Sequence, residues 1–203
     1  MGSRTSTYNR FVMTGKIASS DSIMYLLKND GDLSAISSWG CFNHLFYGCT
    51  SLTQAPELPA LTLAESCYWS MFEKCTSLTT PPELPAMSLT FSCYSVMFSG
   101  CTSLLEAPEL PATTLAHSCY QSMFDGCTSL TTAPELPATV LSDGCYHHMF
   151  YGCTSLTQAP ELPATTLARN CYQSMFNGCT SLTTPPSVLP APNCYAHCYE
   201  SMF

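Results

Sequence analysis

The sequence predicts an α/β repeat solenoid in which each coil of twenty-six residues contributes one short parallel strand and one short helix. Three observations support this fold class. One series of cysteines recurs at this constant step, at Cys49, Cys75, Cys101, Cys127, Cys153 and Cys179. A second series with the same step comprises Cys41, Cys67, Cys93, Cys119, Cys145 and Cys171, and leucines and prolines recur in phase with both. A unit this small cannot bury its own apolar face, so neighbouring units must supply the core.

Composition agrees with a packed core. The chain has 203 residues, of which 46% are hydrophobic and 10% are charged, whereas charged residues make up about a quarter of an average globular domain. The net charge of −8 argues against nucleic acid as a partner. No apolar run approaches the ~20 residues of a membrane-spanning helix, so we expect no membrane insertion.

The strand of each coil is predicted in the segment that begins Thr-Ser-Leu. In the first copy, residues 50–55 alternate between small apolar and polar side chains, as a short strand does. Pro56 and Pro59 cannot donate to a strand ladder. They therefore confine the strand to about four residues.

The helix of each coil is predicted from Ala64 to Lys74 and its equivalents. Apolar side chains recur here at helical spacing, at Leu63, Cys67, Met71, Phe72 and Cys75. Glycines at 48, 100, 126, 152 and 178 stand where a helix needs its left-handed final residue, and Lys74 takes that place in one copy.

The first forty residues differ from the rest, and we assign residues 1–40 to an N-terminal cap or to the tail of an upstream domain. Residues 10–17 are expected to form a strand, and a helix is expected from Asp21 through Leu27. Residues 41–203 form the repeat array of about six copies. One residue is inserted near residues 187–189, so the next rung falls at Cys198.

Both ends of the sequence suggest a piece of a longer protein. The first residues lack the apolar region of a signal peptide. The last copy stops at Phe203, before its expected Gly-Cys-Thr-Ser-Leu, so we expect an array without a C-terminal cap. A monomer is the favoured state, with end-to-end association possible through that end.

The motif Phe-x-Gly-Cys-Thr-Ser-Leu-Thr-x-Ala-Pro-x-Leu-Pro resembles the BspA-like class of leucine-rich repeats of bacterial surface proteins. The resemblance covers Cys41 to Phe203. It departs from the commonest pattern at Cys67-Tyr68-x-x-Met71-Phe72, which replaces the usual Ile-Gly-x-x-Ala-Phe. It implies leucine-rich-repeat architecture and a surface or secreted protein for adhesion or ligand recognition, with an extracellular protein or glycan as partner. It transfers no catalytic residues.

The cysteines are expected to form two ladders of buried thiols. Two cysteines eight residues apart on a helix lie about 12 Å apart, too far for a disulfide. Stacked cysteine side chains on adjacent coils point in parallel, so their Cβ atoms do not approach to the roughly 3.5–4.5 Å that a disulfide requires. A few disulfides, involving the off-ladder Cys194, are the alternative. A zinc site at Cys194, His197 and Cys198 would lack a fourth ligand. The adjacent His147 and His148 would point apart on a helix, so we do not expect them to bind a metal together.

Catalytic signatures are absent from the sequence, which has no nucleophile elbow, His-Glu-x-x-His motif, phosphate loop or dinucleotide fingerprint. We therefore expect a non-enzymatic protein without a cofactor.

Two surfaces compete as binding sites. The first carries what we call the glutamate row: Glu57, Glu83, Glu109, Glu135 and Glu161. Like charges ~5 Å apart repel by about 0.8 kcal/mol in water, so the row either recruits a cation such as calcium or simply fans into solvent. A row of Thr-Ser hydroxyls on the same face is expected to bond the backbone, with an ice-binding plane as the other interpretation.

The second surface is the variable outward side of the predicted helix. Its positions form three columns four residues apart and hence share one helix face. The candidate ligand-binding residues are Glu65, Trp69, Phe91, His117, Gln121, His147, Tyr151 and Arg169. Exposed aromatic side chains are typical of interface anchors, although drift at solvent-exposed positions would also produce variation.

Three functions remain open from the sequence. The first is adhesion or ligand recognition. The second is a structural stalk or spacer that displays another domain. The third is receptor recognition by a phage or secreted factor carrying the same repeat.

Overall fold

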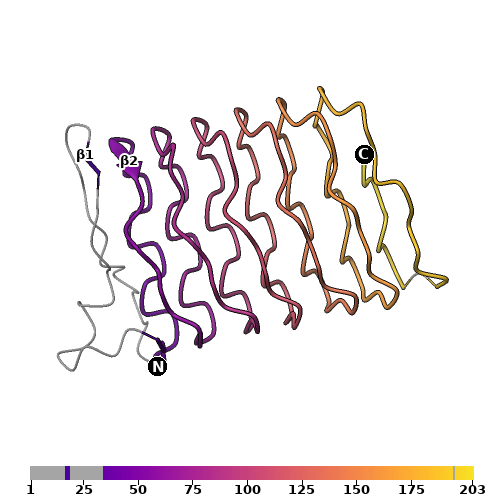
Figure 1. Cartoon of the computed structure of the whole chain (residues 1–203), viewed down its shortest axis with the longest axis horizontal. Coiled ribbons are helices and arrows are strands. Elements are labelled where there is room, and N and C mark those ends of the chain that lie inside the picture. Colours follow the sequence, from indigo (N-terminus) through magenta and orange to yellow (C-terminus); the bar gives the residue numbers. More distant parts are fainter. Residues whose placement is uncertain (1–16, 19–33, 194) are drawn as a thin grey trace, which may run out of the picture.

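The fold is a solenoid whose coils stack along one axis. A computed structural model describes residues 17–18, 34–193 and 195–203. Figure 1 shows the coils side by side along the long axis of the molecule, in sequence order from indigo to yellow. This arrangement confirms the predicted repeat solenoid. The helix expected at residues 21–27 and most of the strand expected at residues 10–17 fall outside these ranges.

The strands are even shorter than predicted. Strand β2 (Leu52–Gln54) pairs in parallel with β1 (Ile17–Ala18), and Ile17 lies opposite Leu52. Later coils are joined at the equivalent place by single parallel bridges, such as Gln54 with Thr80 and Thr132 with Gln158. The prolines that follow each segment limit the pairing, as expected.

A second row of parallel bridges lies on the other side of the proline segment. It joins Ala35 to Thr62, Ser88 to Thr114 and Val140 to Thr166. This row was not predicted from the sequence. It brings residues 35–40 into register with the second coil, and the amide of Gly40 donates to the carbonyl of Glu65.

Tandem β-turns replace the predicted helix, and no α-helix occurs in the part of the chain that the structure describes. In the coil that follows Leu63, the amides of residues 67, 69, 71, 73 and 75 each donate to the carbonyl three residues earlier, at 3.0–3.4 Å. The amides of residues 66, 68, 70, 72 and 74 instead donate to carbonyls of the next coil, at 2.7–3.1 Å. Every second hydrogen bond therefore joins neighbouring coils.

Positive φ angles set the period of these turns. Ser66, Ser70 and Lys74 have φ of 54°, 56° and 62°, and each stands third in a hydrogen-bonded four-residue turn, the arrangement of a type II turn. The type II turns thus repeat every four residues, and a further hydrogen-bonded turn overlaps each consecutive pair. Over a segment this short, a spacing of four and a helical spacing of 3.6 give the same apolar pattern, which explains the mistaken helix.

The glycine column is left-handed as predicted, although it does not end a helix. Its glycines have φ between 67° and 78° and take the third position of the last turn in their coils: Gly48, Gly100, Gly126, Gly152 and Gly178. Lys74 adopts the same conformation in the remaining copy.

The core is built from two ladders of stacked aromatic rings. One ladder contains Phe42, Tyr68, Tyr94, Tyr120, Tyr146, Tyr172 and Tyr199, and the other Phe46, Phe72, Phe98, Phe124, Phe150, Phe176 and Phe203. Successive ring centroids lie 5.5–5.9 Å apart. In the last pairs, Tyr172–Tyr199 and Phe176–Phe203, the partner stands one position beyond the repeat step. This confirms the predicted one-residue insertion.

The cysteines line the same core as thiols. All thirteen described cysteines are in the thiol form, and all except the half-buried Cys41 are buried. In one ladder each thiol from Cys75 to Cys179 donates to a phenylalanine carbonyl of the preceding coil, as Cys75 does to Phe46 at 3.0 Å. Burial raises the pKa of Cys75 to about 12. The thiols are therefore protonated and unreactive at neutral pH, as the prediction of two buried ladders requires.

Cys194, which the disulfide and zinc alternatives both require, lies outside the described residues.

Within the described residues, no helix has the length and hydropathy needed to cross a bilayer.

Candidate functional site

The tandem turns present three outward positions in each coil. Each is the second residue of a type II turn, so the positions are four residues apart. We call this surface the turn face. Its columns are Glu65, Phe91, His117, Asp143 and Arg169; Trp69, Ser95, Gln121, His147 and Gln173; and Glu73, Ser99, Asp125, Tyr151 and Asn177.

Exposure differs between the columns. The first column is exposed throughout, and Phe91 keeps 46% of its surface accessible. In the second column Trp69, Gln121 and His147 are half-buried, while Ser95 is buried. In the third column, Tyr151 is exposed and the other four residues are half-buried. The eight candidate residues therefore lie on the turn face, where a partner can reach them.

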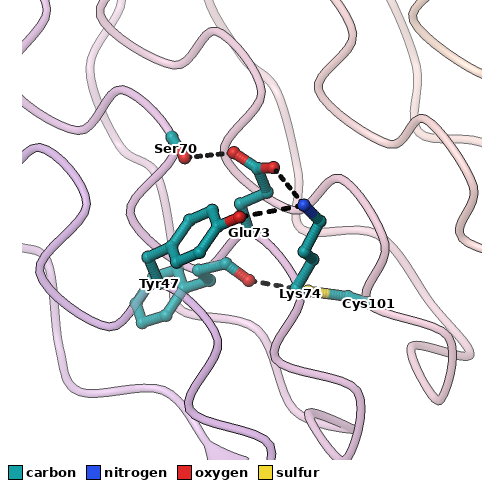
Figure 2. A network of polar contacts seen from close by, with 6 residues as sticks. Tyr47, Ser70, Glu73, Lys74 and Cys101 are labelled. Atoms are coloured by element: carbon teal, nitrogen blue, oxygen red, sulfur yellow. Dashed lines mark hydrogen bonds and ion pairs between the residues drawn. The ribbon is translucent and has the colours of Figure 1, made fainter. Parts of the chain in front are cut away.

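A polar network joins the first two turn segments, as Figure 2 shows. The Lys74 ammonium donates to the Tyr47 hydroxyl oxygen at 2.9 Å and lies 3.5 Å from the Glu73 carboxylate. The Ser70 hydroxyl donates to the other oxygen of Glu73. The hydrogen bond from Lys74 to Tyr47 is the main cause that raises the pKa of Lys74. The network holds Tyr47 and Lys74 of neighbouring coils together.

Trp69 is positioned by a histidine beside this network. The His44 and Trp69 rings meet edge to face, with centroids 4.6 Å apart, a favoured geometry for aromatic pairs. Burial lowers the pKa of His44, and the Glu73 carboxylate opposes that shift. A neutral imidazole therefore supports the half-buried indole.

Two further clusters follow along the face. The Phe91 and His117 rings stack with centroids 5.4 Å apart. The His147 and His148 rings stack at 3.9 Å, and His148 contacts Tyr151 at 5.2 Å. The expectation that the two adjacent histidines splay apart is wrong, because it assumed a helix and they lie on a turn.

In the cluster of His147, His148 and Tyr151, the charge of His148 affects the pKa values of His147 and of the nearby Asp125. Burial lowers the pKa of His147, and the neighbouring His148 lowers it further. Burial raises the pKa of the Asp125 carboxyl, and His148 works in the opposite direction. The pKa shifts thus make His147 harder to protonate, and Asp125 easier to protonate, than the same side chains free in water.

Glu65, Gln121 and Arg169 are more isolated members of the candidate set. The Arg169 amide donates to the Asp143 carboxylate at 3.0 Å, which orders the backbone of the first column and leaves the guanidinium exposed. Glu65 and Gln121 belong to none of the three aromatic clusters found within the described ranges.

Sequence reasoning missed five residues that lie on the turn face or directly beside it: Trp39, His44, Tyr47, Lys74 and His148. Trp39 is 69% exposed and stands one repeat step before Glu65, so the period alone identifies it. His44, Lys74 and His148 occupy left-handed third positions of turns. The helical assumption placed those positions on another face.

The glutamate row lies along a different edge of the solenoid. All five carboxylates are exposed. Four hollows with volumes of about 360–590 Å³ lie along this edge, each lined by the proline-rich turns of two consecutive coils. The residues that the structure describes include no group of three or more His, Cys, Asp or Glu side chains that could hold a metal ion.

Threonine hydroxyls near this edge bond the backbone of the neighbouring coil. Thr79 donates to the carbonyl of Thr53 at 3.1 Å, and Thr183 donates to that of Thr157 at 3.3 Å. In the predicted hydroxyl row itself, Thr102 donates to the carbonyl of Thr76 at 3.5 Å. These bonds favour the backbone-bonding interpretation of the hydroxyls.

Comparison with known proteins gives little beyond this geometry. No family model matches the chain, and no curated protein matches it. A solved structure, the leucine-rich repeat protein of T. pallidum, is similar at a TM-score of 0.46 and 17% identity, over 89% of this chain and 75% of that one. Since this likeness is weak, the class of protein, a repeat solenoid, rests on the stacked coils themselves.

Proposed function

We propose that this solenoid is a non-catalytic recognition module that binds an extracellular protein or glycan through its turn face. The motif resemblance to BspA-like repeats supports a role in adhesion at a bacterial cell surface or in a secreted protein. The structural observation that carries the proposal is a contrast within single turns. The buried Cys-Tyr-x-x-Met-Phe positions repeat from coil to coil, while the outward positions vary and gather aromatic and histidine side chains.

The clusters suit binding because their side chains are ordered before a partner arrives. Trp69 is half-buried against His44, and Tyr151 is held beside His148. Immobilising a free side chain on binding costs about 0.5–1.5 kcal/mol, which such preorganisation reduces. Tryptophan and tyrosine are also the residues most often responsible for affinity at interfaces.

Drift at exposed positions would scatter unrelated side chains over the face. Instead, ring contacts join its aromatic and imidazole side chains into three local groups: His44 with Trp69, Phe91 with His117, and His147 and His148 with Tyr151. This grouping favours a face that meets a partner.

The test begins with a screen of the chain against arrays of extracellular proteins and glycans, with and without calcium. For any hit, the double variant Trp69→Ala/Tyr151→Ala is expected to lose at least about tenfold in affinity, which corresponds to a loss of about 1.4 kcal/mol. Its melting temperature should change little, because Tyr151 is exposed and Trp69 is only half-buried.

Glu109→Gln, on the proline-rich edge, is the matched control and should bind as the original chain does. Undiminished binding by the double variant would exclude the turn face. Silence of a folded sample in the whole screen would instead favour the stalk or spacer function.

A further inference from the structure

The four hollows form one groove, because consecutive hollows share their lining residues. Glu83 lines the first and second hollows, Glu109 the second and third, and Glu135 the third and fourth. Glu57 and Glu161 stand at the two ends. The groove therefore runs parallel to the solenoid axis across five coils, and we call it the proline groove.

Its walls are rich in proline and therefore rigid. Each coil contributes a Pro-Glu-Leu-Pro segment, in which the leucine is buried and the prolines face the hollows. Proline fixes its own φ angle, so the walls lose little conformational freedom when a ligand binds. One exposed carboxylate per coil stands beside these prolines.

The charge of the groove is uncompensated within the described residues. Lys74 and Arg169 are the two basic side chains there apart from histidine, and neither lines any of the hollows. Lys74 is engaged with Tyr47 and Glu73 on the turn face. A partner for this groove must therefore bring its own cations.

The chain itself shows what these carboxylates accept. At the last coil Ser187 stands where the repeat otherwise has glutamate, and both its backbone amide and its hydroxyl donate to Glu161, at 3.2 Å and 2.6 Å. Hydrogen-bond donors on an adjacent segment thus reach a carboxylate of the row without obstruction.

The spacing selects an extended peptide. Coils are 5.5–5.9 Å apart at the aromatic ladders, and alternate side chains on one side of an extended strand are about 6.6 Å apart. The difference of about 1 Å per coil adds up to about 2 Å at each end of a five-coil match centred on Glu109. A flexible lysine side chain can span this displacement. Its methylene stem would lie on the prolines while its ammonium group meets the carboxylate.

We propose that the proline groove binds an extended basic peptide segment in which lysine or arginine occupies every second position. This site is separate from the turn face and does not depend on the function proposed for it. Binding is expected to weaken as salt rises, because exposed ion pairs are screened.

The experiment compares two labelled ten-residue peptides of identical composition by fluorescence anisotropy. One alternates serine and lysine, and the other places five serines before five lysines. The alternating peptide is expected to bind at least about fivefold more tightly to the full chain at low salt, because all five of its lysines share one side of an extended strand and can meet five coils, whereas only three lysines of the block peptide do. Equal affinity would overturn the proposal, since it would mean attraction to net charge alone.

Two charge-matched triple variants locate the site. Glu83→Gln/Glu109→Gln/Glu135→Gln should lose at least about tenfold in affinity for the alternating peptide. Glu65→Gln/Asp143→Asn/Glu200→Gln removes three charges away from the groove and should lose less than about twofold. Equal losses in the two variants would also overturn the proposal.

The outcome is distinguishable from failure of the turn-face function. Trp69→Ala/Tyr151→Ala should bind the alternating peptide as tightly as the original chain. Circular dichroism of each variant establishes that the fold is intact, as expected for substitutions at exposed or half-buried side chains.

Discussion

The inward and outward sides of the same turns differ in how much their residues vary from coil to coil. On the inward side, Met123 and Phe124 have no exposed surface, and Met and Phe recur at these positions in every described coil from the second onward. On the outward side of the same segment, Gln121 and Asp125 have counterparts as different as Trp69 and Tyr151. A turn of four residues thus carries both the most uniform and the most variable positions of the molecule.

This contrast shows which positions of the solenoid can change without unfolding it. An inward side chain contacts the same side chain in the coil before and the coil after, so a change at one rung disturbs two interfaces. An outward side chain meets solvent and a few neighbours on the face. Variation is tolerated there, and binding can evolve on an unchanged scaffold.

The largest effect should follow removal of an inward ring. Phe124→Ala deletes one member of the phenylalanine ladder, which stacks on Phe98 and Phe150 at 5.7 Å and 5.6 Å. We expect a loss of about 3–5 kcal/mol in the free energy of unfolding, measured by urea denaturation. Gln121→Ala, on the outward side, should cost under about 0.5 kcal/mol. Similar losses at both positions would contradict the division between the two sides.

A smaller effect is expected at the left-handed positions between the two sides. Val96 has φ of 61°, a conformation that disfavours a β-branched residue by about 1–2 kcal/mol. Val96→Gly should raise the free energy of unfolding by up to about 1 kcal/mol, since the relieved strain exceeds the loss of a half-buried side chain.

The reverse substitution serves as its counterpart. At Gly126, with φ of 70°, an added Cβ would find its nearest neighbour 3.9 Å away, so space is not the obstacle. Gly126→Ala should therefore cost about 1 kcal/mol through backbone strain alone. The proposed type II turns would be refuted if both changes shifted the thermal midpoint in the same direction.

The smallest effect concerns pH. The pKa of His147 is lowered in the folded chain, mainly by burial, so below its ordinary value of 6.5 the unfolded chain binds the proton first. Stability contributed by neutral His147 is complete above that pH and is lost as the pH falls toward the folded pKa.

His147→Gln, with the residue found at this position in two other coils, should therefore lessen the fall in melting temperature between pH 7.5 and pH 5.5. Gln173→Ala, in the same column, carries no titratable group and should leave the fall unchanged. An undiminished fall in the histidine variant would mean that other groups govern the acid sensitivity.

Sequence reasoning located the coils, the buried ladders and the inserted residue, because each depends on the spacing of apolar side chains along the chain. It identified the three outward columns of the turn face, but it predicted a helix where the backbone forms tandem turns. Leu63, Cys67, Met71 and Cys75 are four residues apart, and this spacing fits tandem turns as well as it fits a short helix. The groupings of His44 with Trp69 and of His147 with His148 depended on that backbone, so they could not be foreseen.

That similar units stack, and which side chains they bury, follows from the amino-acid sequence alone, since so short a repeat leaves each unit without a core of its own. How the backbone hydrogen bonds of each unit are satisfied becomes visible in the folded stack. Half of the amides in the turn segments donate to the next coil, and those donors have no partner in an isolated unit. The conformation of the turns, and with it the layout of both candidate binding surfaces, is therefore a property of the stack.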